Sequence, residues 1–128
     1  MIHFGPLLIR RLLIRPGAIG DFIVSLPAME ALRTGYTEVW CAGQNVPLAR
    51  FADSAQSIVA SGLNRVGLLP AEEVIERLHR FDSIISWYGT NNPEFRDLVE
   101  KLRLPFHFLP ALPSARRMGK LWNVSPTA

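Results

Sequence analysis

The chain has 128 residues, of which 48% are hydrophobic and 20% are charged. This apolar content is enough for one buried core and argues against wholesale disorder. Its apolar runs are too short to span a bilayer, and Arg10 and Arg11 end the first one before a signal-peptide core could form. The net charge of +3 is uneven: residues 1–20 and 104–128 each carry three basic side chains and no acid, so both ends of the chain are basic.

The apolar pattern switches between short runs and helical spacing, which is typical of alternating strands and helices. In chain order, the first half is predicted to contain a strand at 12–15, a turn at 16–20, a helix at 21–33, a strand at 38–41 and a short helix at 47–53. Pro27 falls inside the first helix, where it removes a backbone hydrogen bond, so we expect that helix to be kinked or broken there.

The second half of the chain continues the alternation. It is predicted to contain an apolar segment of undetermined type at 58–60, a weak strand at 65–69, a helix at 71–80, a strand at 83–87, a helix at 92–103 and a last strand at 106–109. Asn92 and Pro93 form a cap and first-turn proline that start the last helix. This order predicts the α/β class, with a Rossmann-like, mainly parallel sheet covered by helices on both faces.

The ligand site of such a sheet lies beyond the carboxyl ends of its strands. Four predicted connections meet at that edge, at residues 16–21, 42–45, 87–92 and 111–116. We therefore expect binding and catalysis at this edge.

Gly17 and Gly20 bracket the turn after the first strand. Glycine suits a turn either because the backbone angles exclude other residues or because a ligand approaches the backbone closely. The spacing does not match a dinucleotide loop, which needs a third glycine, or a P-loop, which needs Gly-Lys-Ser or Gly-Lys-Thr. A Gly-x-x-Gly pair by itself does not identify a nucleotide site.

Asp21 follows this turn and has two interpretations. It can be the N-cap of the next helix, accepting hydrogen bonds from first-turn amides. It can also be a general base that takes a proton from a sugar hydroxyl at the mouth of the sheet. Position and composition favour the cap, and the two roles are compatible.

Residues 12–33 read LLIRPGAIGDFIVSLPAMEALR. This run resembles the opening of glycosyltransferase family 9, the ADP-heptose:lipopolysaccharide heptosyltransferases, in which an apolar strand, a Gly-Asp turn, Leu-Pro-Ala and an Ala-Leu-Arg-like helix end follow one another. The match is contiguous and includes the proline inside the helix. The rest of the chain is similar through its order of elements and through Phe81-Asp82 before a strand.

The resemblance implies a GT-B glycosyltransferase, in which two Rossmann-like domains face each other across a cleft. This chain would be the N-terminal domain, which receives the lipopolysaccharide-core acceptor, while the other domain holds a nucleotide-sugar such as ADP-heptose. Asp21 matches the family's general base, and the turn from Gly17 through Ala18 and Ile19 to Gly20 matches the segment near acceptor and donor. The family needs no metal or other cofactor, so we expect none.

Length is the main departure from the family. Members are more than twice as long, and the donor-binding C-terminal domain has no counterpart here. We therefore assign residues 1–113 to the Rossmann-like acceptor-side domain and 114–128 to a basic tail of truncated or irregular character. Because one wall of the cleft is missing, we expect the chain alone to be inactive, so its status as an enzyme stays open.

Other polar and aromatic residues at the expected edge are candidate substrate-binding residues. They are Gln44, Trp87, Tyr88 and Asn91. Aromatic faces beside amides suit a sugar, although aromatic residues at a strand end are also common in cores. Cys41, the single cysteine, is expected to be a small buried hydrophobe, and His3, His79 and His107 are assigned no catalytic role.

Two alternatives to a glycosyltransferase domain remain open. One is a stand-alone Rossmann-like module that binds a nucleotide or another phosphorylated ligand without catalysis, and the other is a fragment without function. The basic ends could attract phosphorylated ligands or anionic lipids, whereas the aromatic-interleaved basic stripe of an RNA-binding protein is missing. We expect a cytoplasmic protein, with peripheral contact with the inner membrane face as an open possibility, and no nucleic-acid partner.

Overall fold

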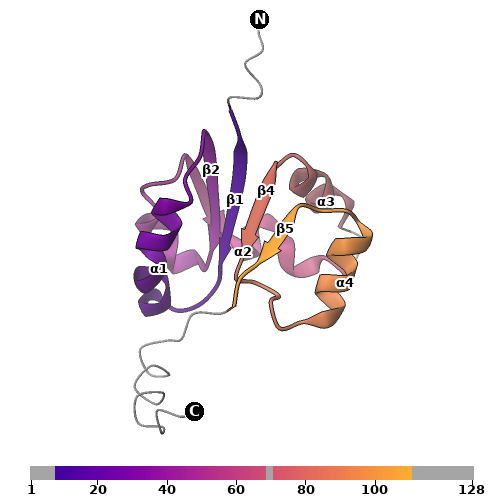
Figure 1. The fold of residues 1–128 in the computed structure, drawn as a ribbon. Helices are drawn as coiled ribbons and strands as arrows, with labels where there is room; N and C mark the ends of the chain where they lie inside the picture. Colours follow the sequence, from indigo (N-terminus) through magenta and orange to yellow (C-terminus); the bar gives the residue numbers. More distant parts are fainter. Residues whose placement is uncertain (1–7, 69–70, 111–128) are drawn as a thin grey trace, which may run out of the picture.

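The computed structural model describes residues 8–68 and 71–110, which form a five-stranded, all-parallel sheet (Figure 1). The strands are β1 (Arg10–Arg15), β2 (Tyr36–Cys41), β3 (Ser54–Ser57), β4 (Ser83–Ser86) and β5 (Phe106–Phe108). They lie side by side in the order β3-β2-β1-β4-β5. The predicted fold class, a Rossmann-like α/β fold with a mainly parallel sheet, is confirmed.

Helices cover the sheet on both faces, as predicted. They are α1 (Ile19–Ala31), the 3-10 helix η2 (Gly43–Leu48), α2 (Ile58–Ser61), the 3-10 helix η3 (Leu63–Arg65), α3 (Glu72–His79) and α4 (Pro93–Lys101). Alternate residues of β1 supply both cores, since Leu13 packs with residues of α1 and Leu12 and Ile14 pack with residues of α2, α3 and α4. Strand β1 is therefore buried on both faces, which explains its uninterrupted apolar run.

The order of the strands creates a switch point between β1 and β4. From β1 the chain adds β2 and β3 on one side, and then returns to add β4 and β5 on the other. The connections that leave β1 and β4 therefore diverge at neighbouring strand ends, where α/β proteins of this kind bind their ligands. The backbone amide of Trp87, just after β4, donates to the carbonyl oxygen of Ile14 in β1 at 2.9 Å.

The third strand differs from the prediction. It is the polar segment Ser54–Ser57, whereas the predicted strand at 65–69 is a 3-10 turn at its start and Leu69 lies outside the described residues. Strand β3 pairs on one side only, with β2, and an edge strand of this kind needs no continuous apolar run. The short helix predicted at 47–53 is instead η2, which begins directly after β2.

Helix α1 begins two residues before the predicted start and continues through Pro27. The predicted break is therefore wrong. Pro27 and Ile23, the residue four positions before it, both lie on the exposed side of the helix, where water can satisfy a freed carbonyl group. The predicted cap of α4 is confirmed, since the side chain of Asn92 accepts a hydrogen bond from the amide of Phe95 at 3.1 Å.

None of the helices in the described part of the chain combines the length and the apolar composition needed to cross a bilayer.

Candidate functional site

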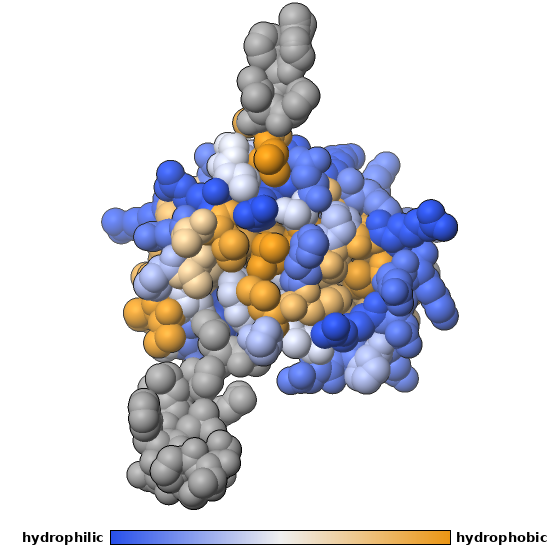
Figure 2. Space-filling view, viewed as in Figure 1, coloured by the Kyte–Doolittle hydropathy of each residue, from blue (hydrophilic) through white to orange (hydrophobic). Residues whose placement is uncertain are grey.

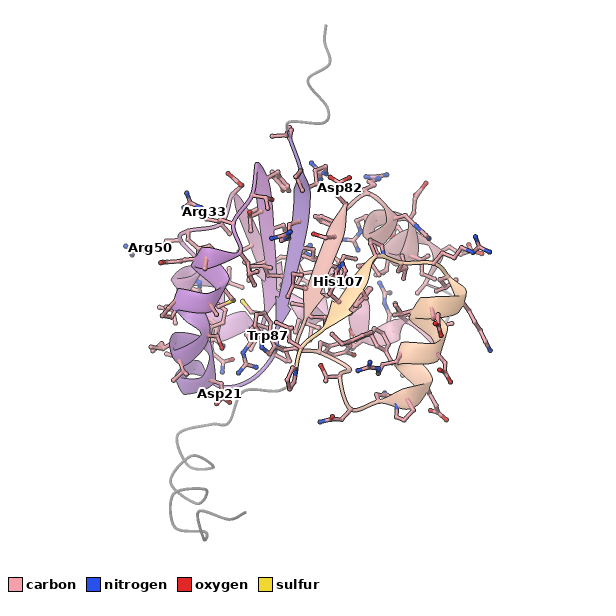
Figure 3. All side chains as sticks on the ribbon, in the orientation of Figure 1. Asp21, Arg33, Arg50, Asp82, Trp87 and His107 are labelled. Atoms are coloured by element: carbon pink, nitrogen blue, oxygen red, sulfur yellow. The ribbon has the colours of Figure 1, made fainter. Side chains whose placement is uncertain are left out.

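Three of the four connections expected at the carboxyl edge meet around the turn between β1 and α1. The side chain of Asn45, after β2, donates to the carbonyl oxygen of Gly17, and the ring centre of Trp87, after β4, lies 5.8 Å from the guanidinium carbon of Arg15. Figure 3 shows Asp21 and Trp87 toward the same end of the sheet, far from Asp82. The fourth connection, residues 111–116, lies outside the described residues, as does the tail at 114–128.

Gly17 is required by the conformation of this turn. Its φ of +116° lies in a region that L residues rarely adopt, and a Cβ atom here would lie 3.2 Å from Oδ2 of Asp21. Gly20 is different, because a Cβ atom there would meet nothing within 4 Å. Ala18, Ile19 and Gly20 are exposed and leave the start of α1 open to a ligand.

Asp21 is the third residue of α1, and the N-cap is Ala18, which makes no side-chain cap bond. The interpretation of Asp21 as N-cap is therefore wrong. Its carboxylate lies in the first turn, where the helix dipole stabilises a negative charge. Oδ1 of this carboxylate is buried and has no hydrogen-bond partner within the described residues.

Arg15 lies beside Asp21 and was not singled out by the sequence. It is only 4% exposed, and its Nε donates to Oγ of Ser25 at 2.7 Å while Nη1 donates to the carbonyl oxygen of Pro16 at 2.6 Å. Oγ of Ser25 in turn donates to the carbonyl oxygen of Asp21 at 2.8 Å. Burial lowers the pKa of Arg15, and the negative charge of Asp21 opposes that shift.

The connection after β2 contributes a different residue from the one predicted to bind substrate. Gln44 is exposed at the edge, whereas Asn45 is fully buried and its Nδ2 donates to the carbonyl oxygen of Gly17 at 3.1 Å. Oδ1 of Asn45 has no partner in the described part of the molecule. Two adjacent amides after a strand look alike in sequence, and only the path of η2 decides which one turns inward.

The connection after β4 forms an open cavity of about 420 Å³ lined by residues 87–92. Trp87 is 4% exposed, and its Nε1 is buried without a partner among the described residues. Tyr88 is half-buried, and burial raises the pKa of its hydroxyl. Asn91 is exposed on the rim of the cavity. These three predicted residues therefore lie together, one strand away from Asp21.

The three connections share a chemical property. Of the buried side-chain polar atoms in the described residues, those without a hydrogen-bond partner are Asp21 Oδ1, Asn45 Oδ1 and Trp87 Nε1. Buried polar groups in native proteins are almost always paired, so these three atoms need partners other than the described residues. Two of the atoms accept hydrogen bonds and one donates, which matches hydroxyl groups or water, since both can donate and accept.

The remaining reactive residues are the single cysteine and the histidines. Cys41 is fully buried, and burial raises the pKa of its thiol to about 11, which confirms the prediction of a buried hydrophobe. His79 ends α3, His107 is exposed in β5, and His3 is outside the described residues. Within residues 8–68 and 71–110, no group of three His, Cys, Asp or Glu side chains is arranged to hold a metal ion.

No family model, curated protein or solved structure matches the chain. The residues and geometry of the site are therefore the basis for a function.

Proposed function

We propose that this chain is the acceptor-side domain of a GT-B glycosyltransferase of the heptosyltransferase type, family 9. The enzyme would transfer a sugar from a nucleotide-sugar, such as ADP-heptose, to a lipopolysaccharide-core or related glycan acceptor. The observation that carries this proposal is the position of Asp21, whose carboxylate lies against Gly17 at the switch point of the sheet with one buried oxygen unpaired among the described residues.

Asp21 would act as the general base of the transfer. Its carboxylate takes the proton of an acceptor hydroxyl while the hydroxyl oxygen forms a bond with the anomeric carbon of the donor sugar. The bond from that carbon to the phosphate oxygen breaks, and its electron pair leaves with the nucleoside diphosphate. Asn45 and Trp87 flank the turn, and because both side chains are almost fully buried, an acceptor hydroxyl would reach their unpaired Oδ1 and Nε1 atoms only after a local shift of the turn.

The same atoms argue against a stand-alone site for phosphorylated ligands. A phosphate group at neutral pH offers acceptors, whereas the cluster has two unpaired acceptors and one donor. The carboxylate of Asp21 would also repel a phosphate at the start of α1. The unpaired atoms therefore favour a hydroxyl-bearing ligand at this turn.

The outer face of α1 supports a second domain in the complete enzyme. Ile19, Ile23 and Val24 are 51%, 50% and 49% exposed, although large apolar side chains usually lie inside. Figure 2 shows apolar surface over this helix and over the centre of the sheet. Contiguous apolar patches of this kind commonly mark an interface with another domain or protein. A donor-binding domain on this side would cover the patch and complete the cleft.

The proposed substrates suggest where the enzyme would work. A nucleotide-sugar and a lipid-linked core acceptor meet at the cytoplasmic face of the inner membrane, so a cytoplasmic enzyme in peripheral contact with that membrane fits the proposal. In the proposed enzyme the described domain forms one wall of the cleft and the donor-binding domain forms the other, so we expect the 128 residues by themselves to be inactive.

The test joins this chain to the donor-binding domain of a heptosyltransferase and measures sugar transfer. Asp21→Asn removes the base and should lower kcat by about a hundredfold or more. Glu30→Gln, an exposed change in the same helix, is the matched control and should leave transfer unchanged. Undiminished transfer by the Asp21→Asn enzyme would refute the role of Asp21, and transfer by the 128-residue chain alone would refute the need for a second domain.

A further inference from the structure

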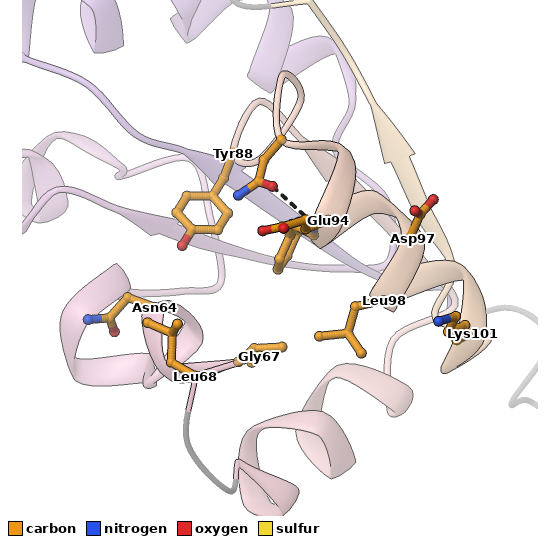
Figure 4. A pocket seen from close by; sticks show the side chains of 11 residues that line it. Asn64, Gly67, Leu68, Tyr88, Glu94, Asp97, Leu98 and Lys101 are labelled. Carbon is orange, nitrogen blue, oxygen red and sulfur yellow. Dashed lines mark hydrogen bonds between the residues drawn. The ribbon is translucent and has the colours of Figure 1, made fainter.

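Another cavity, of about 530 Å³, lies between α4 and the segment 64–68 (Figure 4). Its size is within the range of small-molecule sites in proteins. It is lined from the segment 64–68 by Val66 and Gly67 and from α4 by Glu94, Phe95, Asp97 and Leu98.

The floor of this cavity is apolar and closely packed. Val66 and Phe95 are both 7% exposed, and the ring of Tyr88 packs edge-on against the ring of Phe95 at 5.4 Å between centres. Gly67 holds the segment 64–68 against α4, because its φ is +91° and a Cβ atom at this position would lie 3.3 Å from Leu98. The floor is therefore a preformed surface.

The rim of the cavity is polar and its side chains are free to bind. Glu94 and Asp97 are exposed, and within the described part of the chain neither carboxylate accepts a hydrogen bond or forms an ion pair. The hydroxyl of Tyr88 likewise makes no hydrogen bond to the described residues. The rim thus offers two carboxylates and a phenol above an apolar floor.

The cavity adjoins the candidate site. Tyr88 and Asn92 line both this cavity and the one formed by residues 87–92. Trp87 lines only the cavity formed by residues 87–92, and its ring centre lies 5.8 Å from the guanidinium carbon of Arg15, just before the turn that leads to Asp21. The two cavities therefore share part of their lining and lie next to each other.

We infer that the cavity between α4 and residues 64–68 is a binding subsite for an uncharged sugar ring. A sugar presents an apolar C–H face, which suits the floor of Tyr88, Phe95 and Leu98, and a ring of hydroxyl groups, which donate to carboxylates such as those of Glu94 and Asp97. The two carboxylates repel phosphorylated and acidic sugars, and Lys101 offsets only one of these charges. In the proposed enzyme, and resting on that function, the subsite holds an acceptor sugar remote from the reacting hydroxyl.

The inference is tested by NMR titration of the ¹⁵N-labelled 128-residue chain. The probes are methyl glucoside, lactose and cellobiose, with glucose 6-phosphate for comparison. We expect the uncharged sugars to shift the amide signals of Gly67, Tyr88 and Leu98 at millimolar concentration, and glucose 6-phosphate to bind about tenfold more weakly because of its charge. Absence of these shifts with every uncharged probe, or equal binding of the phosphorylated sugar, would overturn the inference.

Two substitutions locate the effect. Asp97→Ala removes an exposed carboxylate from the rim without disturbing the floor and should weaken binding about tenfold, whereas Glu100→Ala, exposed on the same helix outside the cavity, should not change it. Equal affinities of these two variants would also overturn the inference. Failure of methyl glucoside to bind would overturn the subsite, whereas undiminished transfer by the Asp21→Asn enzyme would overturn the catalytic role, so the two failures are separate results.

Discussion

The side-chain amide of Asn45 donates a 3.1 Å hydrogen bond to the carbonyl oxygen of Gly17 and so ties the segment after β2 to the turn that carries Asp21. On the other side of that turn, Arg15 binds Ser25, whose hydroxyl binds the backbone of Asp21. The turn is thus held from two sides by buried polar side chains. A carboxylate mounted on such a turn has a defined position, which a general base requires.

Removal of the Asn45 side chain should show how much this contact stabilises the fold. Asn45→Ala loses the hydrogen bond but also removes an unpaired buried oxygen, so we expect a loss of about 1 kcal/mol in the free energy of unfolding. Asn45→Asp should cost more, about 3 kcal/mol, because it sets a buried carboxylate against the carbonyl oxygen of Gly17. Urea unfolding measures which of the two variants has the lower free energy of unfolding. Gln44→Ala, an exposed neighbour, is the control and should change little, and an Asp variant as stable as the Ala variant would contradict the contact.

The two glycines of the turn should respond in opposite directions to alanine. Gly17→Ala introduces a Cβ atom beside Asp21 at a positive φ, and we expect it to lower the free energy of unfolding by about 1 kcal/mol or more. Gly20→Ala adds a methyl group in open space within α1, where alanine favours the helix, and should keep or raise stability. Thermal unfolding of the two variants measures the difference. Equal destabilisation by both changes would show that the turn differs from the one described.

The fold class could be predicted from the sequence because its signals are local. Each signal can be read from neighbouring residues alone. They are the apolar run of the buried strand β1, the helix cap at Asn92, and the apolar side of α3 and of α4 that packs into the core. Strand β3 could not be found in this way, since Ser-Ala-Gln-Ser at an edge carries no apolar pattern and its pairing with β2 is a tertiary contact. Helix α1 began earlier than expected because Ala18 gives no capping signal.

Asp21 could be named as a candidate site residue from the sequence because a recognisable run of residues surrounds it. Arg15 and Asn45 were missed, since a buried arginine and a buried amide look in sequence like ordinary surface residues at strand ends. Their burial depends on long-range contacts, such as that between Arg15 and Ser25 in the next element. Only one feature of the sequence could have marked Arg15 as a candidate. It ends the strand directly after apolar residues, rather than after a polar one.

The exposed apolar face of α1 should tolerate charge. Ile23→Lys and Val24→Lys replace half-exposed side chains, so each should change the free energy of unfolding by less than about 0.5 kcal/mol while lowering self-association and binding of a hydrophobic dye. Phe22→Ala, at a fully buried position of the same helix, should cost about 3 kcal/mol or more. Sedimentation velocity measures the self-association of the lysine variants, and dye fluorescence measures their exposed apolar surface. If the lysine variants were as destabilised as the Phe22 variant, the outer face of α1 would be buried by the rest of the chain.

Cys41 should make stability depend on pH in the alkaline range. Burial raises the pKa of its thiol from an ordinary 9.0 to about 11, so the unfolded chain loses this proton at lower pH than the folded one. The contribution of the neutral thiol is therefore complete below pH 9.0 and is lost as the pH rises toward about 11. Burial also raises the pKa of Tyr36 and Tyr88, and comparison of the native chain with Cys41→Ala cancels those contributions.

Urea unfolding of the native chain and of Cys41→Ala at intervals between pH 8 and pH 11 tests the direction of this pH dependence. The native chain should lose stability more steeply than Cys41→Ala, even though the variant starts lower because it leaves a small cavity. In the folded chain the thiol should also resist iodoacetamide at pH 8 and react only after unfolding, because the thiolate is the reactive form. Parallel pH profiles of the two chains, or rapid alkylation of the folded one, would show that Cys41 is accessible and that the core beside α1 opens in solution.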